Sequence, residues 1–142
     1  MLDTGMPNPR RVTNGVDGSR VAMLLAVLEK RAGHNFQKKD VYVSTVGGVR
    51  LVEPAADLAI AIALTSALQD EPIAHTVVAF GEISLAGEIR PVSAAKQRAA
   101  EATRMGFTTR FDASSGTVQT AVARALGTGL SRRDAELNAA FG

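Results

Sequence analysis

Two charged side chains stand where they could do chemistry. Asp57 is the single charge in an apolar run from Pro54 to Leu68, and Lys96 lies near the start of a predicted helix. Because a carboxylate in so apolar a helix is costly to desolvate, we expect Asp57 to form a structural pair or a cap rather than to act in catalysis. The simplest interpretation of Lys96 is a solvated residue beside the alanine face of its helix.

Metal binding and thiol chemistry have little support in the sequence. The absence of cysteine excludes disulfides, thiolate zinc sites and a cysteine nucleophile. His34 and His75 lie in different predicted elements, without a partner at ligand spacing, so we expect surface or strand-end positions and no metal site. Gly47 and Gly48 separate two strand-like runs and open no helix, which predicts a turn or bulge rather than a phosphate cradle.

The basic residues raise the possibility of nucleic-acid binding. The net charge is only +2 and arginine outnumbers lysine, so the pI of about 9.4 overstates the basicity of the chain. Ordinary solvated charges explain most of these residues, but the planar guanidinium fork suits phosphate better than an ammonium group does. The residues we consider as DNA contacts are Arg10, Arg11, Arg50, Arg104 and Arg110.

The first half of the chain contains the elements that must position Asp57. Residues 17–32 combine a capping aspartate with apolar residues at helical spacing, which predicts an amphipathic helix ending at Gly33. Residues 40–46 and 49–52 are rich in β-branched residues and predict two short strands or one kinked ribbon. Pro54 suits the first position of a helix that continues to Leu68 and is apolar on nearly every face, so we expect central burial.

The second half alternates short strands and helices. Residues 75–80 predict a buried strand, and the alternation from Ile83 to Ile89 predicts a hairpin. Ser93 is expected to cap a helix that runs to about Met105. A brief strand at residues 108–111 and a short helix at residues 117–126 complete the pattern.

The organisation predicted is one domain at residues 12–130, with a leader or linker at 1–11 and a charged tail at 131–142. Apolar residues make up 46% of the chain and aromatic residues 4%, which indicates an aliphatic core in an α/β protein. No signal-peptide pattern or apolar run of bilayer length is present, so we expect a cytoplasmic protein without membrane contact.

Two stretches resemble the proteolytic domain of the Lon family: residues 53–57, which read Glu-Pro-Ala-Ala-Asp, and residues 81–92, which read Gly-Glu-Ile-Ser-Leu-Ala-Gly-Glu-Ile-Arg-Pro-Val. The resemblance implies an α/β (α+β) fold of the Lon proteolytic, ribosomal protein S5 domain 2-like type. In Lon the first stretch reads Gly-Pro-Ser-Ala-Gly and contains a nucleophilic serine, whose lysine base lies just beyond the second stretch. These positions correspond to Ala55 and Lys96.

Half of the Lon dyad is therefore absent. A methyl group cannot attack a carbonyl, so acyl-enzyme chemistry at Ala55 is excluded and no catalytic residue is expected. A single knockout mutation does not explain the sequence either, since Glu53 and Asp57 replace both flanking glycines of Lon. The chain instead resembles the C-terminal domain of the RadA/Sms family over roughly residues 7–127, through the stretches at residues 8–11, 17–20, 46–50 and 56–59.

The RadA/Sms resemblance implies a noncatalytic oligomerisation and DNA-binding module of a DNA repair and recombination protein. It implies a hexameric ring, double-stranded and branched DNA as partners, and contact with recombination proteins such as RecA through the rest of the protein. The zinc motif and the ATPase of that family have no counterpart in this sequence, so zinc, ATP and Mg²⁺ are expected only in other domains.

Two alternatives stay open at this point. One is a purely structural scaffold that docks partner proteins. The other is a Lon-type peptidase that uses another serine, with Ser44, Ser84 and Ser93 as the candidates. None of these serines stands in the Lon motif, which makes the peptidase the weaker alternative.

Overall fold

The computed structural model describes residues 2–3 and 9–129, and the predicted tail at 131–142 lies outside the described residues. Helix α1 (Gly18–Ala32) confirms the first predicted element. The Asp17 carboxylate accepts a hydrogen bond from the Ser19 N–H at 2.9 Å, and Gly33 ends the helix with φ at 75°. The stripe of α1 that includes Leu24 and Leu28 is buried in the core.

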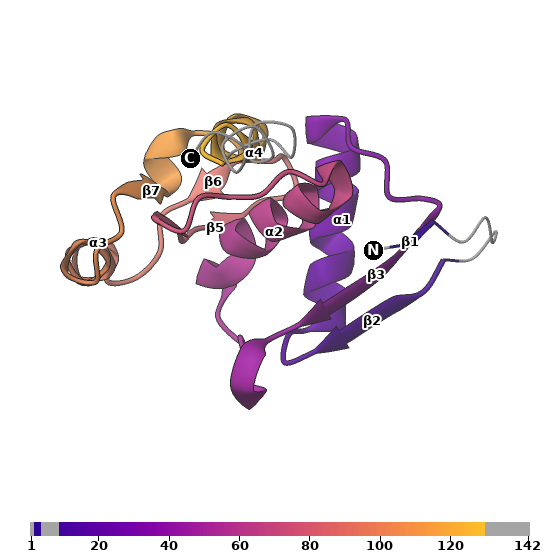
Figure 1. The fold of residues 1–142 in the computed structure, drawn as a ribbon, viewed down its shortest axis with the longest axis horizontal. Helices are drawn as coiled ribbons and strands as arrows, with labels where there is room; N and C mark the ends of the chain where they lie inside the picture. Colours follow the sequence, from indigo (N-terminus) through magenta and orange to yellow (C-terminus); the bar gives the residue numbers. More distant parts are fainter. Residues whose placement is uncertain (1, 4–8, 130–142) are drawn as a thin grey trace, which may run out of the picture.

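A three-stranded sheet lies against α1. Strand β2 (Arg11–Asn14) pairs in parallel with β3 (Lys39–Ser44), and β1 (Leu2–Asp3) pairs antiparallel with the other edge of β3. Helix α1 is the crossover between the parallel strands β2 and β3 (Figure 1). The segment 1–11, expected as a leader without regular structure, therefore contains β1 and the first residue of β2.

The segment between β3 and α2 differs from the prediction. Residues 49–52 form no strand, and Leu51 makes only an isolated bridge with Val16. The preceding turn η1 (Val46–Gly48) places Gly47 and Gly48 at φ values of 72° and 73°, which turns the chain away from the direction of β3. The prediction of a turn at these glycines is confirmed, whereas the prediction of a second strand at residues 49–52 is wrong.

Helix α2 (Asp57–Gln69) follows a short 3₁₀ turn, η2 (Pro54–Ala56), and packs against α1 and against α4 (Val118–Leu126), as Figure 1 shows. Its inner face is buried, with Leu58 and Ala61 fully enclosed. The expectation of burial on nearly every face is wrong for one stripe, because Ala59, Ala63 and Ala67 are exposed. The i, i+4, i+8 spacing places these three alanines on one side of the helix.

The remaining elements form two strand pairs and a helix. Strands β4 (Val77–Ala79) and β7 (Thr109–Phe111) pair in parallel, and β5 (Glu82–Ile83) and β6 (Ile89–Arg90) form the predicted antiparallel hairpin. Helix α3 (Ala95–Arg104) lies between β6 and β7 in the chain. Ser93 does not cap it, since α3 begins after Ala94 at φ 56° without a side-chain cap.

The core is aliphatic, as the composition predicts, and joins α1, α2 and α4 to the strands. Phe36 is the largest fully buried side chain, and Thr117 caps α4 through its hydroxyl. The arrangement of helices and strands confirms the α/β class. None of the helices in the described part of the chain is both long and apolar enough to cross a bilayer.

Candidate functional site

The entrance to α2 is built by three chain segments that approach closely. Ala55 is buried, and its carbonyl accepts a hydrogen bond from the Gly81 N–H at 2.9 Å, while the Gly81 carbonyl accepts one from Leu58 N–H at 3.1 Å. A Cβ atom on Gly81 would lie 2.6 Å from a methyl carbon of Ile89. The two stretches that carry the Lon resemblance thus meet in space, beside the buried side chain of Ala55.

Asp57 is 1% exposed and lies at the centre of this entrance. Its Oδ1 accepts a hydrogen bond from Arg20 Nε at 2.8 Å, and its Oδ2 accepts bonds from Arg20 Nη2 and, at 3.0 Å, from Ile83 N–H. The hydrogen bond with Asp57 raises the pKa of Arg20, and the charge of Glu82, 3.6 Å from Arg20, acts in the same direction. Because both carboxylate oxygens have partners, Asp57 forms with Arg20 the structural ion pair that its sequence context predicts.

Lys96 is exposed in the first turn of α3. Two residues further along, Arg98 forms an ion pair with Glu53 at 2.8 Å and donates from Nε to the Ser93 carbonyl at 3.0 Å. This ion pair holds the start of α3 against the segment that leads into Pro54. The segments that carry Ala55 and Lys96 are therefore neighbours.

The three alternative serines have local partners. Ser44 Oγ donates to the Thr45 carbonyl, Ser84 Oγ accepts from the Glu88 N–H, and Ser93 contributes its carbonyl to Arg98. Within the described residues, no histidine, lysine or carboxylate side chain is a hydrogen-bond partner of these hydroxyls. The arrangement provides no base that would activate any of the three.

The five arginines considered as DNA contacts separate into two groups. Arg11 donates to the main-chain carbonyls of Arg10, Phe36 and Lys39, so its guanidinium is committed to holding a loop. Arg104 pairs with Glu101, which raises the pKa of Arg104. Across residues 2–3 and 9–129, Arg10 and Arg50 are the members of the set whose guanidinium groups have no protein partner.

Arg110 belongs to the committed group, because it pairs with Asp112 at 2.9 Å. Burial acts to raise the pKa of Asp112, but hydrogen bonds from the hydroxyl and N–H of Ser114 and from Arg110 together hold that pKa below its ordinary value. Asp112 also caps the 3₁₀ turn η3 (Ala113–Ser115). The Arg110–Asp112 pair is therefore part of a local capping arrangement.

A family model described as subunit ChlI of Mg-chelatase matches residues 17–113, more than half of the chain. The chain belongs to this family. The matched span contains α1, the α2 entrance with Ala55 and Asp57, the β5–β6 hairpin and α3.

The chain is also similar to curated proteins named DNA repair protein RadA. The protein of Escherichia coli (strain K12) is 48% identical over 102 residues, which are 72% of this chain and 22% of that protein. The Mycobacterium tuberculosis (strain ATCC 25618 / H37Rv) protein is 52% identical over 101 residues, 71% of this chain and 21% of that protein. The Bacillus subtilis (strain 168) protein is 47% identical over 104 residues, 73% of this chain and 23% of that protein.

These similarities confirm the resemblance to the RadA family that the sequence motifs indicate. The chain is similar to a part of each of these proteins and spans about a fifth of the length of the curated relatives it matches. Among the described residues, no group of three histidine, cysteine or carboxylate residues could hold a metal ion. His75 is exposed, and His34 contacts Gln69 at 3.2 Å.

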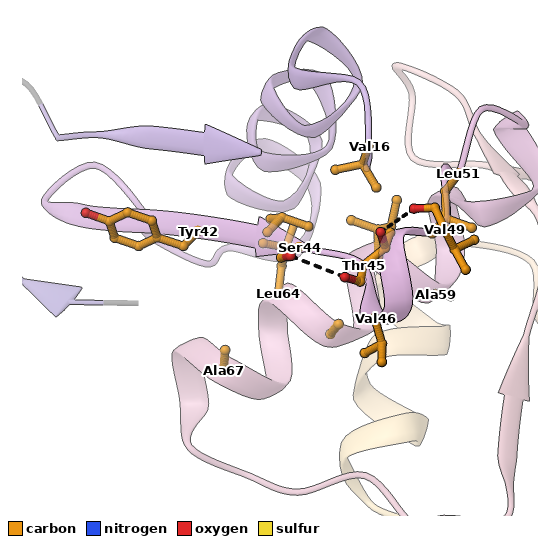
Figure 2. A pocket seen from close by; sticks show the side chains of 13 residues that line it. Val16, Tyr42, Ser44, Thr45, Val46, Val49, Leu51, Ala59, Leu64 and Ala67 are labelled. Atoms are coloured by element: carbon orange, nitrogen blue, oxygen red, sulfur yellow. Dashed lines mark hydrogen bonds between the residues drawn. The ribbon is translucent and has the colours of Figure 1, made fainter. Parts of the chain in front are cut away.

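Two features of this region are not anticipated by the sequence reasoning. The first is the pairing of Arg20, which the sequence does not distinguish from the other basic residues. A cation in the first turn of a helix opposes the helix dipole, and this unfavourable position is the signal of a specific partner. The second feature is an uncharged groove of about 560 Å³ between β3, the η1 turn and the exposed stripe of α2 (Figure 2). Its signal is the excess of apolar residues on the outer face of α2.

Proposed function

We propose that this chain is a noncatalytic DNA-binding and self-associating module of a RadA-type DNA repair protein. The similarity to proteins named DNA repair protein RadA, at 45–52% identity over about 100 residues, carries this proposal. We further propose that the fold is of the Lon proteolytic type. The contact between the segments of Ala55 and Lys96 and the β5–β6 hairpin beside Ala55 support that assignment.

The site at Ala55 supports the noncatalytic part of the proposal. Its side chain is a buried methyl group. Both carboxylate oxygens of the neighbouring Asp57 already accept hydrogen bonds from Arg20 and from Ile83 N–H. In a RadA-type protein, ATP, Mg²⁺ and zinc would then be bound by other regions, and contacts with recombination proteins such as RecA would belong to the whole protein.

Restoring the serine is therefore expected to restore no peptidase activity. In Ala55→Ser the new hydroxyl would lie in a buried position beside an ion pair, and Glu53 and Asp57 would still stand where Lon has glycines. Hydrolysis of unfolded casein by the variant should equal that of the unchanged chain. A serine-specific fluorophosphonate that labels the variant and not the parent would contradict this expectation.

Arg10 is the strongest candidate for a phosphate contact. It is exposed, and its main-chain N–H bonds to Asp40 at 2.7 Å, which fixes the start of β2. The hydrogen bonds of Arg11 to Phe36 and Lys39 place Arg10 beside the 36–39 loop, where Lys38 is also exposed. Double-stranded or branched DNA bound there would be held by backbone charge, without sequence preference.

Replacing Arg10 by alanine is expected to weaken duplex binding by about tenfold at low salt, close to the loss of one charged hydrogen bond. The logarithmic salt slope should fall by about one unit for each phosphate that the variant no longer neutralises. Fluorescence anisotropy at several salt concentrations measures both quantities. Arg104→Ala is the matched control, because Arg104 is exposed but already paired with Glu101.

Equal losses of affinity in Arg10→Ala and Arg104→Ala would indicate a diffuse effect of net charge and would contradict a defined phosphate contact at Arg10. Unchanged binding in both would favour the scaffold alternative. One observation favours that alternative already: Arg11, Arg104 and Arg110 are committed to contacts within the chain.

A further inference from the structure

The groove along α2 is a surface whose occupant can be inferred. It lies between β3, the segment after η1 and the exposed alanine stripe of α2, and Figure 2 shows Tyr42, Val46 and Val49 standing around it with Ala59 and Ala67 on the helix. Ala63 also lines it. No charged residue contributes to its lining.

The groove is open to solvent, and several of its apolar side chains are exposed. Val46 is 90% exposed, and Tyr42 and Val49 are about half exposed. Contiguous apolar surface with an aromatic residue and without charge is typical of the centre of a protein interface. Nucleic acid is a poor occupant, because it requires cations facing the phosphates.

An exposed apolar side chain of suitable size stands elsewhere on the same chain. Leu85, at the tip of the β5–β6 hairpin, is 74% exposed. Hydrogen bonds from Gly87 N–H and Glu88 N–H to the Ser84 carbonyl and hydroxyl fix the tip. Leu85 is not among the residues that line the groove of its own copy, and it lies instead beside a separate hollow with Met23 and Glu82.

The charges beside the two surfaces are complementary. Arg50 lies in the chain between the groove-lining residues Val49 and Leu51 and lines the adjoining hollow, which shares these two residues with the groove. Glu88 follows the hairpin tip. Over the described ranges, neither the Arg50 guanidinium nor the Glu88 carboxylate has an ion-pair partner. The exposed Leu85 side chain with the nearby Glu88 carboxylate is therefore complementary to the apolar groove with the nearby Arg50 guanidinium.

We propose that Leu85 of one copy of this chain seats in the groove of a second copy, with Glu88 of the first copy facing Arg50 of the second. The proposal rests on the self-association proposed above and names its surfaces. Since the hairpin tip and the groove are different patches, the contact is head-to-tail. It leaves the groove of one copy and the Leu85 side chain of the other free to bind further copies. Arg50 is then an interface residue rather than a DNA contact.

Cysteine cross-linking tests this contact directly, because the chain contains no cysteine. Single variants Ala63→Cys and Leu85→Cys are mixed and oxidised, and a disulfide-linked heterodimer is expected in good yield. Ala63→Cys mixed with Met105→Cys is the matched control, since Met105 is exposed and apolar but lies at the end of α3. That mixture should give only background cross-linking.

Sedimentation of uncrosslinked variants provides the second measurement. Ala63→Glu and Leu85→Asp are each expected to raise the dissociation constant for self-association by about tenfold or more. Arg50→Glu and Glu88→Arg should each weaken assembly, and their combination should restore it. Circular dichroism and the urea midpoint verify that each variant is folded.

The outcomes separate this proposal from the one on which it rests. A chain that stays monomeric at every concentration overturns both the self-association and the seating of Leu85. A chain that assembles, but without the Ala63–Leu85 cross-link and with no effect of Ala63→Glu, overturns the seating alone. Protection of Ala63→Cys from maleimide in monomeric full-length RadA-type protein, but not in this chain, assigns the groove to another segment and also overturns it.

Discussion

Replacing Arg20 by alanine is expected to lower the free energy of unfolding by up to about 3–5 kcal/mol, the cost of leaving a buried charge without its partner, reduced by solvent because the Arg20 side chain is 33% exposed. Asp57 is 1% exposed and accepts two hydrogen bonds from Arg20, whereas Ile83 N–H alone would remain after the substitution. Since whole domains are stable by only about 5–15 kcal/mol, such a loss would remove a large part of the stability of the chain.

Urea denaturation followed by circular dichroism measures this loss, with the slope of the transition checked for constancy. Arg104→Ala is the control, because the Arg104–Glu101 pair is a surface i, i+3 pair of small expected effect. The double variant Arg20→Met/Asp57→Leu should be far more stable than Arg20→Ala, since it removes both charges. If Arg20→Ala were as stable as the unchanged chain, the ion pair would contribute nothing to the fold.

Gly15→Ala is the second substitution with a large expected effect. Gly15 has φ at 84°, and a Cβ atom there would overlap the Thr45 hydroxyl and lie 2.6 Å from the Val49 carbonyl oxygen. The expected destabilisation is about 2–5 kcal/mol, from a left-handed backbone penalty of about 1–2 kcal/mol and overpacking of about 1–3 kcal/mol. The clash would also displace the segment that borders the groove.

Gly48→Ala isolates the backbone contribution. Gly48 has a similar φ of 73°, but no atom lies within 4 Å of the position of its Cβ. Its expected cost is therefore only the backbone penalty of about 1–2 kcal/mol. The two variants are compared by urea denaturation, and equal decreases in stability would show that close packing around Gly15 has no role.

Local signals in the sequence are sufficient for the elements with capping residues and clear periodicity. Asp17 and Gly33 bound α1 as predicted, and the alternation after Ile83 gives the observed hairpin. Both kinds of signal act within a few residues of the chain, so they can be interpreted without tertiary contacts. The pairing of Asp57 is predictable too, because the cost of burying an unpaired carboxylate does not depend on the fold.

Features that depend on distant residues are not predictable in the same way. Residues 49–52 have strand-like composition, but no second strand lies beside them apart from one bridge at Val16. Arg11 is committed by carbonyls 25 and 28 residues away, and Arg20 by a carboxylate 37 residues away. A sequence pattern identifies the charge of an arginine but not its partner, so three of the five DNA candidates are engaged within the chain.

The two residues that replace the Lon glycines have both acquired partners, Glu53 with Arg98 and Asp57 with Arg20. This matters for evolutionary reversal. Under the proposed Lon-type fold, a change toward the Lon motif would need small residues at 53 and 57 as well as serine at 55, and Asp57→Gly alone would leave Arg20 without its partner at the entrance to α2. Asp57→Gly on its own is therefore expected to be less stable than the present chain, because it removes the carboxylate that Arg20 and Ile83 N–H bind. The Arg20–Asp57 pair thus disfavours a single substitution at either position, so that a change there would have to involve both residues together.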